Sequence, residues 1–272
     1  MTQKKLKDIK RVLTIAGSDS SAGAGIQADL KAITACGGYA MTAITAITAQ
    51  NTEGVREIET MSASIVREQI YAVAEDIGID AIKIGMLPTK EIVDVVIEAI
   101  KHYKIKNVVL DPVMVATSGD MLVGGDVAKH IIKNLMPLST VVTPNTPECK
   151  FITGMNIIDT NLYDIAARHM MFLGAKNILI KSGHINSDTI TDVLFFENGK
   201  KASFPFKKID TKNTHGTGCS LSSAIACYLA QGYSLEVSVE KAEMYIHEAI
   251  KEANYKIGNG HGPINHFYSF IK

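Results

Sequence analysis

One glycine-rich segment carries groups that could bind an anion and accept a proton. Residues 210–220 read Asp-Thr-Lys-Asn-Thr-His-Gly-Thr-Gly-Cys-Ser and lead into the apolar helical stretch 221–230. Free N–H groups and the dipole at a helix N-terminus attract negative charge. The same dipoles should lower the pKa of Cys219 and leave it partly thiolate near neutral pH. The segment predicts a base beside an anion hole, as phosphoryl transfer requires, although Cys219 by itself could equally be a core cysteine.

Two acidic residues follow short apolar runs that are expected to be strands. Asp111 comes directly after run 108–110. Glu148 follows run 141–143. Ligands of parallel sheets bind beyond the C-terminal strand ends, so these carboxylates could hold Mg²⁺ through water. Each also has a structural interpretation: Asp111 precedes a proline and could cap a turn, and segment 146–148, Thr-Pro-Glu, matches a helix start with threonine as N-cap.

Lys181 is a further candidate, because it follows the apolar run 178–180. Phosphoryl transfer depends mainly on positioning and on neutralising the charge of the phosphate groups. A lysine at a strand end could supply part of that neutralisation, or it could simply be solvated.

A second segment of small residues lies near the N-terminus. Residues 16–25, Ala-Gly-Ser-Asp-Ser-Ser-Ala-Gly-Ala-Gly, connect the apolar run 12–16 to the helical pattern 26–31. Small residues let a ligand approach the backbone closely. The segment is not a dinucleotide fingerprint, because Ala28 stands where the third glycine would be, and the chain has no Gly-Lys-Ser/Thr of a P-loop. It could equally be a flexible turn in which Asp19 is a cap.

Short apolar runs rich in β-branched residues alternate with segments that are apolar on one helical face. The runs predict buried strands, and the segments, such as 92–100 and 239–253, predict helices. This alternation predicts an α/β fold with a mostly parallel central sheet and helices on both faces, a three-layer α/β/α arrangement. Segments 191–196 and 202–206, joined through an Asn-Gly pair, predict an antiparallel hairpin. The expected buried strands are residues 12–16, 41–49, 81–84, 108–110, 141–143 and 178–180.

Composition argues for a small-molecule partner. The 272 residues include 28 basic and 28 acidic ones, so nothing indicates nucleic acid or an anionic membrane as a partner. The four cysteines form no Cys-x-x-Cys pair, which favours reduced thiols, and no apolar run reaches the roughly 18 residues of a membrane span. We expect a cytoplasmic protein with a single domain, residues 1–272, in which residues 1–10 form a flexible extension.

The order of the motifs along the chain is itself informative. The chain contains AGSDSSAGAGIQADLK, TAITAQNT, KIGML, LDPVMVATSGD, TPNTPE, KSGH and NTHGTGCS, in that order. This ordered set resembles the hydroxymethylpyrimidine/phosphomethylpyrimidine kinases of thiamine synthesis, within the ribokinase-like superfamily. The resemblance implies a ribokinase-like fold with an active site along one sheet edge. It also implies a homodimeric enzyme that uses ATP and Mg²⁺ to phosphorylate 4-amino-5-hydroxymethyl-2-methylpyrimidine to its monophosphate and then to its diphosphate.

The resemblance also implies roles for individual residues. Cys219 would be the base, in the place of the aspartate of related sugar kinases. Gln50 would pair with the aminopyrimidine, because its amide can accept from the amino group and donate to a ring nitrogen. Asp111 and Glu148 would organise Mg²⁺ and phosphate. The anion hole would consist of Gly216, Thr217 and Gly218, ATP would face Lys181 and Thr211, and the substrate would contact Gly17, Asp19, Gln50, Met86 and Val113.

Two other functions remain open on these motifs. A pyridoxal or pyridoxine kinase of the same branch would also bind a hydroxymethyl group on a flat heteroaromatic ring, and a non-catalytic pyrimidine sensor would keep the pocket without the transfer. The chain also departs from the family pattern. Ala22 replaces a common glycine in segment 21–23, and Ser182 replaces one in segment 181–184. The side chains of Ala22 and Ser182 lie beside the expected ligands and could shift the affinity for them.

Overall fold

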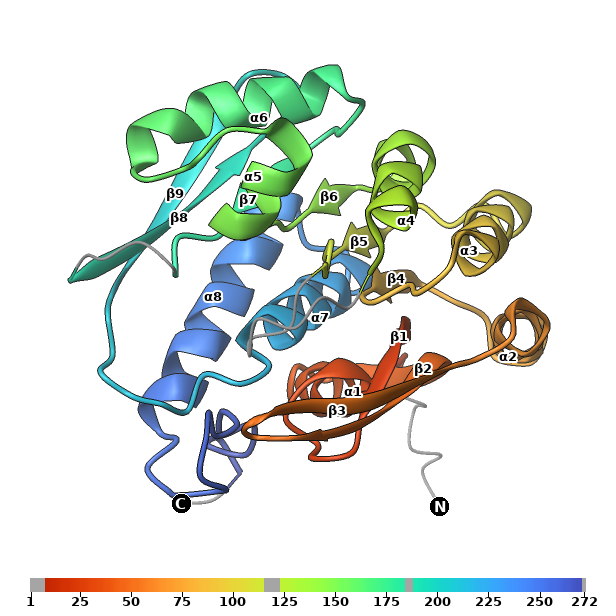
Figure 1. Cartoon of the computed structure of the whole chain (residues 1–272), viewed down its shortest axis with the longest axis horizontal. Helices are drawn as coiled ribbons and strands as arrows, with labels where there is room; N and C mark the ends of the chain where they lie inside the picture. The colour runs from red at the N-terminus through yellow and green to blue at the C-terminus, as the bar shows by residue number, and fades with distance from the viewer. Residues whose placement is uncertain (1–7, 115–122, 184–187, 271–272) are drawn as a thin grey trace, which may run out of the picture.

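One nine-stranded sheet runs through the molecule, in the strand order β3-β2-β1-β4-β5-β6-β7-β8-β9 (Figure 1). The computed structural model describes residues 8–114, 123–183 and 188–270, so the motif residues 115–122 and His184 lie outside the description. The strands are β1 (Arg11–Asp19), β2 (Tyr39–Asn51), β3 (Gly54–Thr60), β4 (Ala81–Ile84), β5 (Val108–Leu110), β6 (Val141–Val142), β7 (Ile178–Ile180), β8 (Thr189–Phe195) and β9 (Lys201–Lys207).

The central strands are parallel, and all the expected buried runs form strands. β2, β1, β4, β5, β6 and β7 run in one direction. β8 and β9 add the expected antiparallel hairpin, with Gly199 at φ 82° in its turn. β3 was not predicted, because arginine and glutamate side chains interrupt its apolar pattern. It pairs antiparallel with β2 at the edge of the sheet, where side chains need not be buried.

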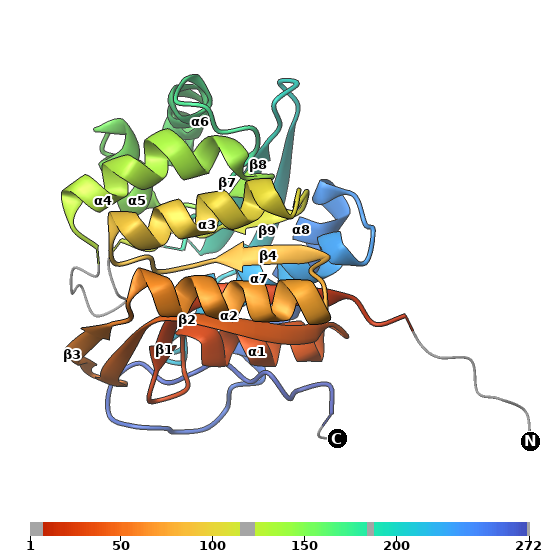
Figure 2. The ribbon, with the colours of Figure 1, turned by 90° about the vertical axis from the view of Figure 1, so that its right-hand side faces the viewer.

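Helices cover both faces of the sheet, because alternate strand residues are apolar on both sides. In β1, Leu13 and Ile15 face one helical layer while Val12 faces the other, and all three side chains are fully buried. The first layer contains α2 to α6, of which α2, α3 and α4 face the viewer in Figure 2. The second layer contains α1, α7 and α8. The prediction of a three-layer α/β/α fold is therefore confirmed.

The predicted helical segments 92–100 and 239–253 correspond to α3 and α8. Ser62, Thr89 and Ser234 cap α2, α3 and α8, since each side chain accepts a hydrogen bond from a backbone N–H of the first turn. None of the helices in the described part of the chain is long and apolar enough to span a membrane. The helices are α1 (Gly25–Ala35), α2 (Ala63–Asp76), α3 (Lys90–His102), α4 (Gly125–His130), α5 (Thr146–Thr153), α6 (Tyr163–Phe172), α7 (Thr217–Ala230) and α8 (Leu235–Lys251), with single turns η1 (Ile131–Leu135), η2 (Met136–Leu138) and η3 (Thr160–Leu162).

The parallel strands all end at one edge of the sheet, and the segments that follow them meet there. Backbone pairing extends past the strands at this edge. Isolated bridges join Asn145 to Lys181, and Ser18 to Gly25 at the start of α1. The edge therefore brings together loops from distant parts of the chain.

Leu13→Ala should lower the free energy of unfolding by about 2–5 kcal/mol, because the substitution leaves a cavity in the fully buried centre of β1. Ile9→Ala is the control: Ile9 is 51% exposed, so its loss should change stability by less than about 0.5 kcal/mol. Urea denaturation of both variants measures the difference. Equal destabilisation would contradict the central position of β1.

Candidate active site

A cavity of about 730 Å³ opens over the C-terminal edge of the sheet. Its walls come from the ends of β1 and β2, the loops after β4, β5, β6 and β7, and the start of α7. Every residue predicted to act in the site lines this one cavity: Gly17, Asp19, Gln50, Met86, Asp111, Val113, Glu148, Lys181, Thr211, Gly216, Thr217, Gly218 and Cys219. The fold thus gathers the whole predicted set, although lining a cavity does not by itself assign a role.

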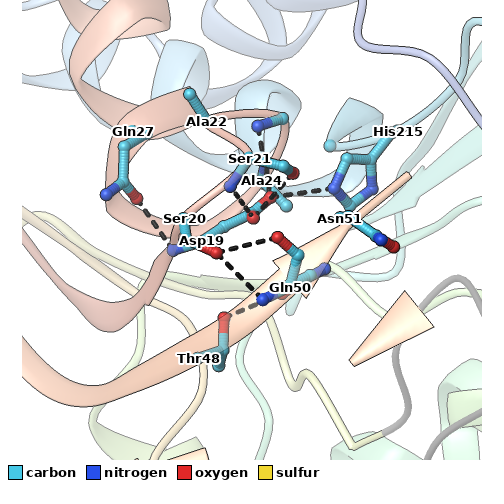
Figure 3. Close-up of polar contacts among 12 residues, drawn as sticks. Asp19, Ser20, Ser21, Ala22, Ala24, Gln27, Thr48, Gln50, Asn51 and His215 are labelled. Atoms are coloured by element: carbon cyan, nitrogen blue, oxygen red, sulfur yellow. Dashed lines mark hydrogen bonds and ion pairs between the residues drawn. The ribbon is translucent and has the colours of Figure 1, made fainter. Parts of the chain in front are cut away.

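Asp19 organises the first glycine-rich loop (Figure 3). Its Oδ1 accepts hydrogen bonds from the backbone N–H and the hydroxyl of Ser21, both at 2.8 Å. Its Oδ2 accepts from the N–H groups of Gly23 and Ala24 and from Nε2 of His215, the last at 2.9 Å. Burial disfavours the charge, but the hydrogen bonds from His215 and Ser21 outweigh it and lower the pKa of Asp19. The carboxylate is thus occupied by protein donors, which favours the cap interpretation over direct substrate contact.

Gln50 stands at the end of β2 with its backbone and side chain both oriented. Ser20 Oγ donates to the Gln50 carbonyl and accepts from its N–H (Figure 3). Thr48 Oγ1 donates to Gln50 Oε1 at 3.0 Å. Met86, which lines the same cavity, packs so closely on Gly17 that a Cβ there would lie 2.8 Å from the methionine methyl group. A preoriented amide and a closely packed apolar side chain in one cavity suit a flat polar ring.

Residues 260–262, near the C-terminus, connect two loops that border the cavity. His261 N–H donates to the Thr52 carbonyl, and Gly260 N–H donates to Thr52 Oγ1, in the turn between β2 and β3. The Gly262 carbonyl accepts from the His215 N–H. The segment therefore links the β2–β3 turn, which follows Gln50, to the loop that begins α7.

Asp111 and Lys181 form an ion pair in the cavity wall, in which Asp111 is buried and the Lys181 side chain is 12% exposed. Lys181 Nζ lies 2.8 Å from Asp111 Oδ1, which also accepts from Thr143 Oγ1. Burial would raise the pKa of Asp111, but the charges of Lys181 and Lys83 outweigh it and lower that pKa. Lys181 is therefore not a solvated strand end.

Glu148 is both a helix cap and an acid of the site. Its side chain accepts from the Asn145 N–H, while Asn145 Oδ1 accepts from the Glu148 N–H, which makes a capping box. The prediction of Thr146 as N-cap was wrong by one residue, because Asn145 completes the reciprocal pair. Burial raises the pKa of Glu148 to about 7. The charge of Lys181 opposes this rise, and the charge of Asp111 adds to it.

The residues Asp111 and Glu148 offer buried carboxylate oxygens close enough to influence each other's charge. Mg²⁺ is commonly held by one or two carboxylates, water and substrate phosphates. Within the described residues, no group of three or more His, Cys, Asp or Glu side chains is arranged to hold a metal ion. The two carboxylates fit such a water-rich Mg²⁺ site.

The first turn of α7 faces this acidic and basic cluster. Gly216 is the N-cap, in a left-handed conformation with φ 79°. A Cβ on Gly216 would overlap the Gly23 carbonyl oxygen, so the two glycine-rich loops touch through their backbones. A Cβ on Gly218 would lie 3.2 Å from Lys181 Nζ. The N–H groups of this turn and the ammonium of Lys181 can thus meet the same anion.

Cys219 is more protected than its position at a helix start predicted. Burial raises the pKa of its thiol to about 11, although the charge of Lys83 and a hydrogen bond from the Gly25 N–H oppose the rise. The predicted lowering of the pKa was therefore wrong, because desolvation of the thiolate outweighs the helix dipole. In the unliganded protein Cys219 is a thiol.

Three buried charged residues of the cavity wall were not predicted. Lys83 interrupts the apolar run of β4 and is fully buried, and a charge within such a run was the available signal. Asp192 on β8 and Glu243 on α8 also line the cavity and are buried. Burial, with the neighbouring Asp192, raises the pKa of Glu243 well above its ordinary value. Asp192 and Glu243 lie in segments where polar and apolar residues are mixed, so nothing in the sequence indicated that they are cavity residues.

A family model described as phosphomethylpyrimidine kinase matches residues 19–265. The chain belongs to this family. It is 45% identical over 262 residues to the hydroxymethylpyrimidine/phosphomethylpyrimidine kinase of Rhizobium meliloti (strain 1021), covering 96% of this chain and 98% of that protein. It is 41% identical over 260 residues to the enzyme of the same name from Bacillus subtilis (strain 168), covering 95% of each. As a family member the chain is a phosphotransferase.

Solved structures show the same fold. The phosphomethylpyrimidine kinase of Clostridium difficile 630 is 43% identical with a TM-score of 0.78, over 89% of this chain and 99% of that one. The pyridoxal kinase of Bacillus subtilis, solved as an ADP complex, is 35% identical with a TM-score of 0.89, over 97% of this chain and 100% of that one. The family and the closely related pyridoxal kinases thus share one architecture.

Gly216→Ala should lower both stability and turnover, because its Cβ would overlap the Gly23 carbonyl at the junction of the two loops. Gly199→Ala is a matched control: Gly199 also has a positive φ, 82°, but a Cβ there meets nothing within 4 Å. The control should lose about 1–2 kcal/mol and keep its turnover. Thermal denaturation and steady-state assays measure both, and equal effects would contradict the tight junction.

Proposed function

We propose that the chain transfers the γ-phosphoryl group of ATP to the hydroxymethyl group of 4-amino-5-hydroxymethyl-2-methylpyrimidine, and then phosphorylates the monophosphate to the diphosphate, in thiamine biosynthesis. The observation that carries the proposal is a single cavity lined by two kinds of groups. Gln50 and Met86 line it and can hold a flat polar ring, and Lys181, Asp111 and the first turn of α7 line it and can hold phosphate groups. The names of the relatives support this substrate.

The transfer needs charge neutralisation more than covalent chemistry. The N–H groups around Gly216, Thr217 and Gly218 would bind the phosphoryl oxygens, and Lys181 would exchange part of its contact with Asp111 for phosphate. Asp111 and Glu148 would hold Mg²⁺ through water, and the bound ion would add positive charge beside the phosphates. Cys219 would take the proton of the attacking hydroxyl, which requires that the site favour its thiolate once it is loaded.

The remaining wall of the cavity suits the nucleoside part of ATP. Apolar side chains of Phe206, Leu221, Ile246 and Ile250 line it together with Thr211. An apolar slot with few polar groups is typical of a site that holds a heteroaromatic base. The pyridoxal kinase of Bacillus subtilis, solved as an ADP complex, supports adenine-nucleotide binding by this chain.

Pyridoxal or pyridoxine phosphorylation is the second candidate. The structural likeness to the pyridoxal kinase of Bacillus subtilis favours it, because the two share an architecture over nearly the whole chain. Higher identity to the hydroxymethylpyrimidine/phosphomethylpyrimidine kinases places the pyrimidine first. A coupled ATP-consumption assay with hydroxymethylpyrimidine, its monophosphate, pyridoxal, pyridoxine and ribose tests the order, and a preference for pyridoxal would overturn it.

We further propose a single kinase domain that acts as a homodimer in the cytoplasm, on the basis of the family resemblance. Analytical ultracentrifugation over a range of concentrations measures the oligomeric state. A monomer at all concentrations would contradict the dimer.

Cys219→Ala should reduce kcat by about 10²–10⁴-fold, because general-base catalysis contributes on this order, while pyrimidine binding stays largely intact. Steady-state kinetics and calorimetric titration with the pyrimidine separate the two effects. Cys36→Ala is the matched control, since Cys36 lies at the C-terminal end of α1, outside the cavity wall, and its loss should leave kcat unchanged. Unchanged turnover in Cys219→Ala would exclude the thiol as base.

Gln50→Leu should weaken kcat/KM for the aminopyrimidine by about 10–100-fold, because a buried polar group of the ligand then lacks its partner. Pyridoxal, which has no amino group to pair with the Gln50 amide, should lose much less. Parallel assays of the two substrates give the ratio. A similar loss for both would remove Gln50 from the basis of specificity.

A further inference from the structure

Lys83 is a charged residue in the middle of a strand whose side chains are all fully buried. Its ammonium lies 2.8 and 2.9 Å from the two carboxylate oxygens of Asp29 on α1. Asp29 also accepts hydrogen bonds from Thr14 Oγ1 on β1 and Ser223 Oγ on α7, at 2.5 and 2.8 Å. Both side chains of the ion pair have no exposed surface. The pair is thus fixed between the sheet and the helices of the second layer.

Stability does not explain this ion pair well. Taking two charges out of water costs several kcal/mol per ion, and aliphatic residues of similar volume often replace such pairs without loss. The other residues of β4 are aliphatic and equally buried. Lys83 also lines the cavity, so it lies where a charge could act on the chemistry.

The position of Lys83 relative to Cys219 follows from two adjacent helices. α1 and α7 pack against each other, and residues at the same height along the two helices face each other. At the first level Gly25 of α1 lies beside Cys219 of α7, where its backbone N–H helps to lower the pKa of the thiol. One helical turn further on, Asp29 of α1 pairs with Ser223 of α7. The Asp29–Lys83 pair therefore lies one turn beneath the thiol.

The Lys83 ammonium extends from the level of Asp29 towards the C-terminal end of β4. Lys83 and Gly85 point to the same face, because they are two residues apart along an extended chain. A Cβ on Gly85 would lie 3.0 Å from Lys83 Nζ. The ammonium thus reaches the end of β4 and lies next to the backbone of Gly85.

We propose that Lys83, held by Asp29, is a positioning residue for the base: its buried ammonium stabilises the thiolate of Cys219. The proposal rests on the role of Cys219 as base in the proposed function. It assigns a task to a lysine that was not among the predicted site residues.

The charges around the thiol support this role. Lys83 is the largest influence that opposes the effect of burial on Cys219, ahead of the acids Asp29 and Asp111, which act in the other direction. Lys181 also interacts with the thiol electrostatically. Burial disfavours the ammonium of Lys83, but Asp29 outweighs it and raises its pKa, so Lys83 is charged. Removing this cation must therefore raise the pKa of Cys219.

The test measures the thiol directly. The pH dependence of iodoacetamide alkylation at Cys219 is followed by mass spectrometry of its peptide, and the pH dependence of kcat/KM is measured beside it. Lys83→Met removes the cation but leaves Asp29 unpaired. The double variant Asp29→Asn with Lys83→Met removes both charges, so no buried charge is left without a partner. Lys90→Met, at an exposed lysine on α3 across the sheet, is the control.

In Lys83→Met the midpoint of alkylation should rise by at least about one pH unit, so that alkylation below the midpoint is about tenfold slower. In the double variant it should rise by less, because Asp29→Asn also removes a charge that raises the pKa of Cys219. The acid limb of kcat/KM should move in the same direction, and Lys90→Met should match the wild type. Wild-type alkylation in a folded variant of either kind would overturn the proposal. A shifted alkylation midpoint with an unshifted kcat/KM profile would support the effect of Lys83 on the thiol and exclude Cys219 as the base.

Discussion

The hydrogen bond between Asp19 and His215 joins the two glycine-rich loops on which the site depends. Asp19 holds its own loop through backbone N–H groups, and His215 directly precedes the start of α7. Because neither Gly23 nor Gly216 has a side chain, the loops meet backbone to backbone. This contact places the N-termini of α1 and α7 side by side, with Cys219 between them. The anion hole is thus a product of two segments nearly two hundred residues apart.

Burial, more than local helix geometry, sets the charge state of the residues in this site. Cys219 stands in the first turn of a helix, yet desolvation keeps it a thiol. Glu148 accepts a hydrogen bond at a helix start, yet burial raises its pKa to about 7. Asp111 stays ionised because Lys181 and Lys83 are close to it. Each carboxylate and thiol therefore depends on which cation lies beside it, so a bound phosphate that draws Lys181 away would change several charge states together.

Two departures from the family pattern have local structural explanations. Ala22 has a φ of 63°, a left-handed conformation in which the glycine expected from the family resemblance would avoid a steric cost. Ser182 donates its hydroxyl to Asp192 and accepts from the Thr191 N–H. Its added group therefore fastens the strand end to β8 and does not project freely towards a ligand. Both changes adjust the loops that hold the site.

The sequence by itself determined the alternation of strands and helices, the hairpin of β8 and β9, and a set of predicted site residues that all line the cavity. These features depend on local periodicity, turn chemistry and the order of motifs. Only the tertiary structure decided that Asp19 organises a loop, that Asn145 is the N-cap of α5, that β3 pairs as an edge strand, and that Cys219 is protonated. Each of these outcomes depends on which partner lies nearby and how much water is excluded, and packing between distant segments sets both.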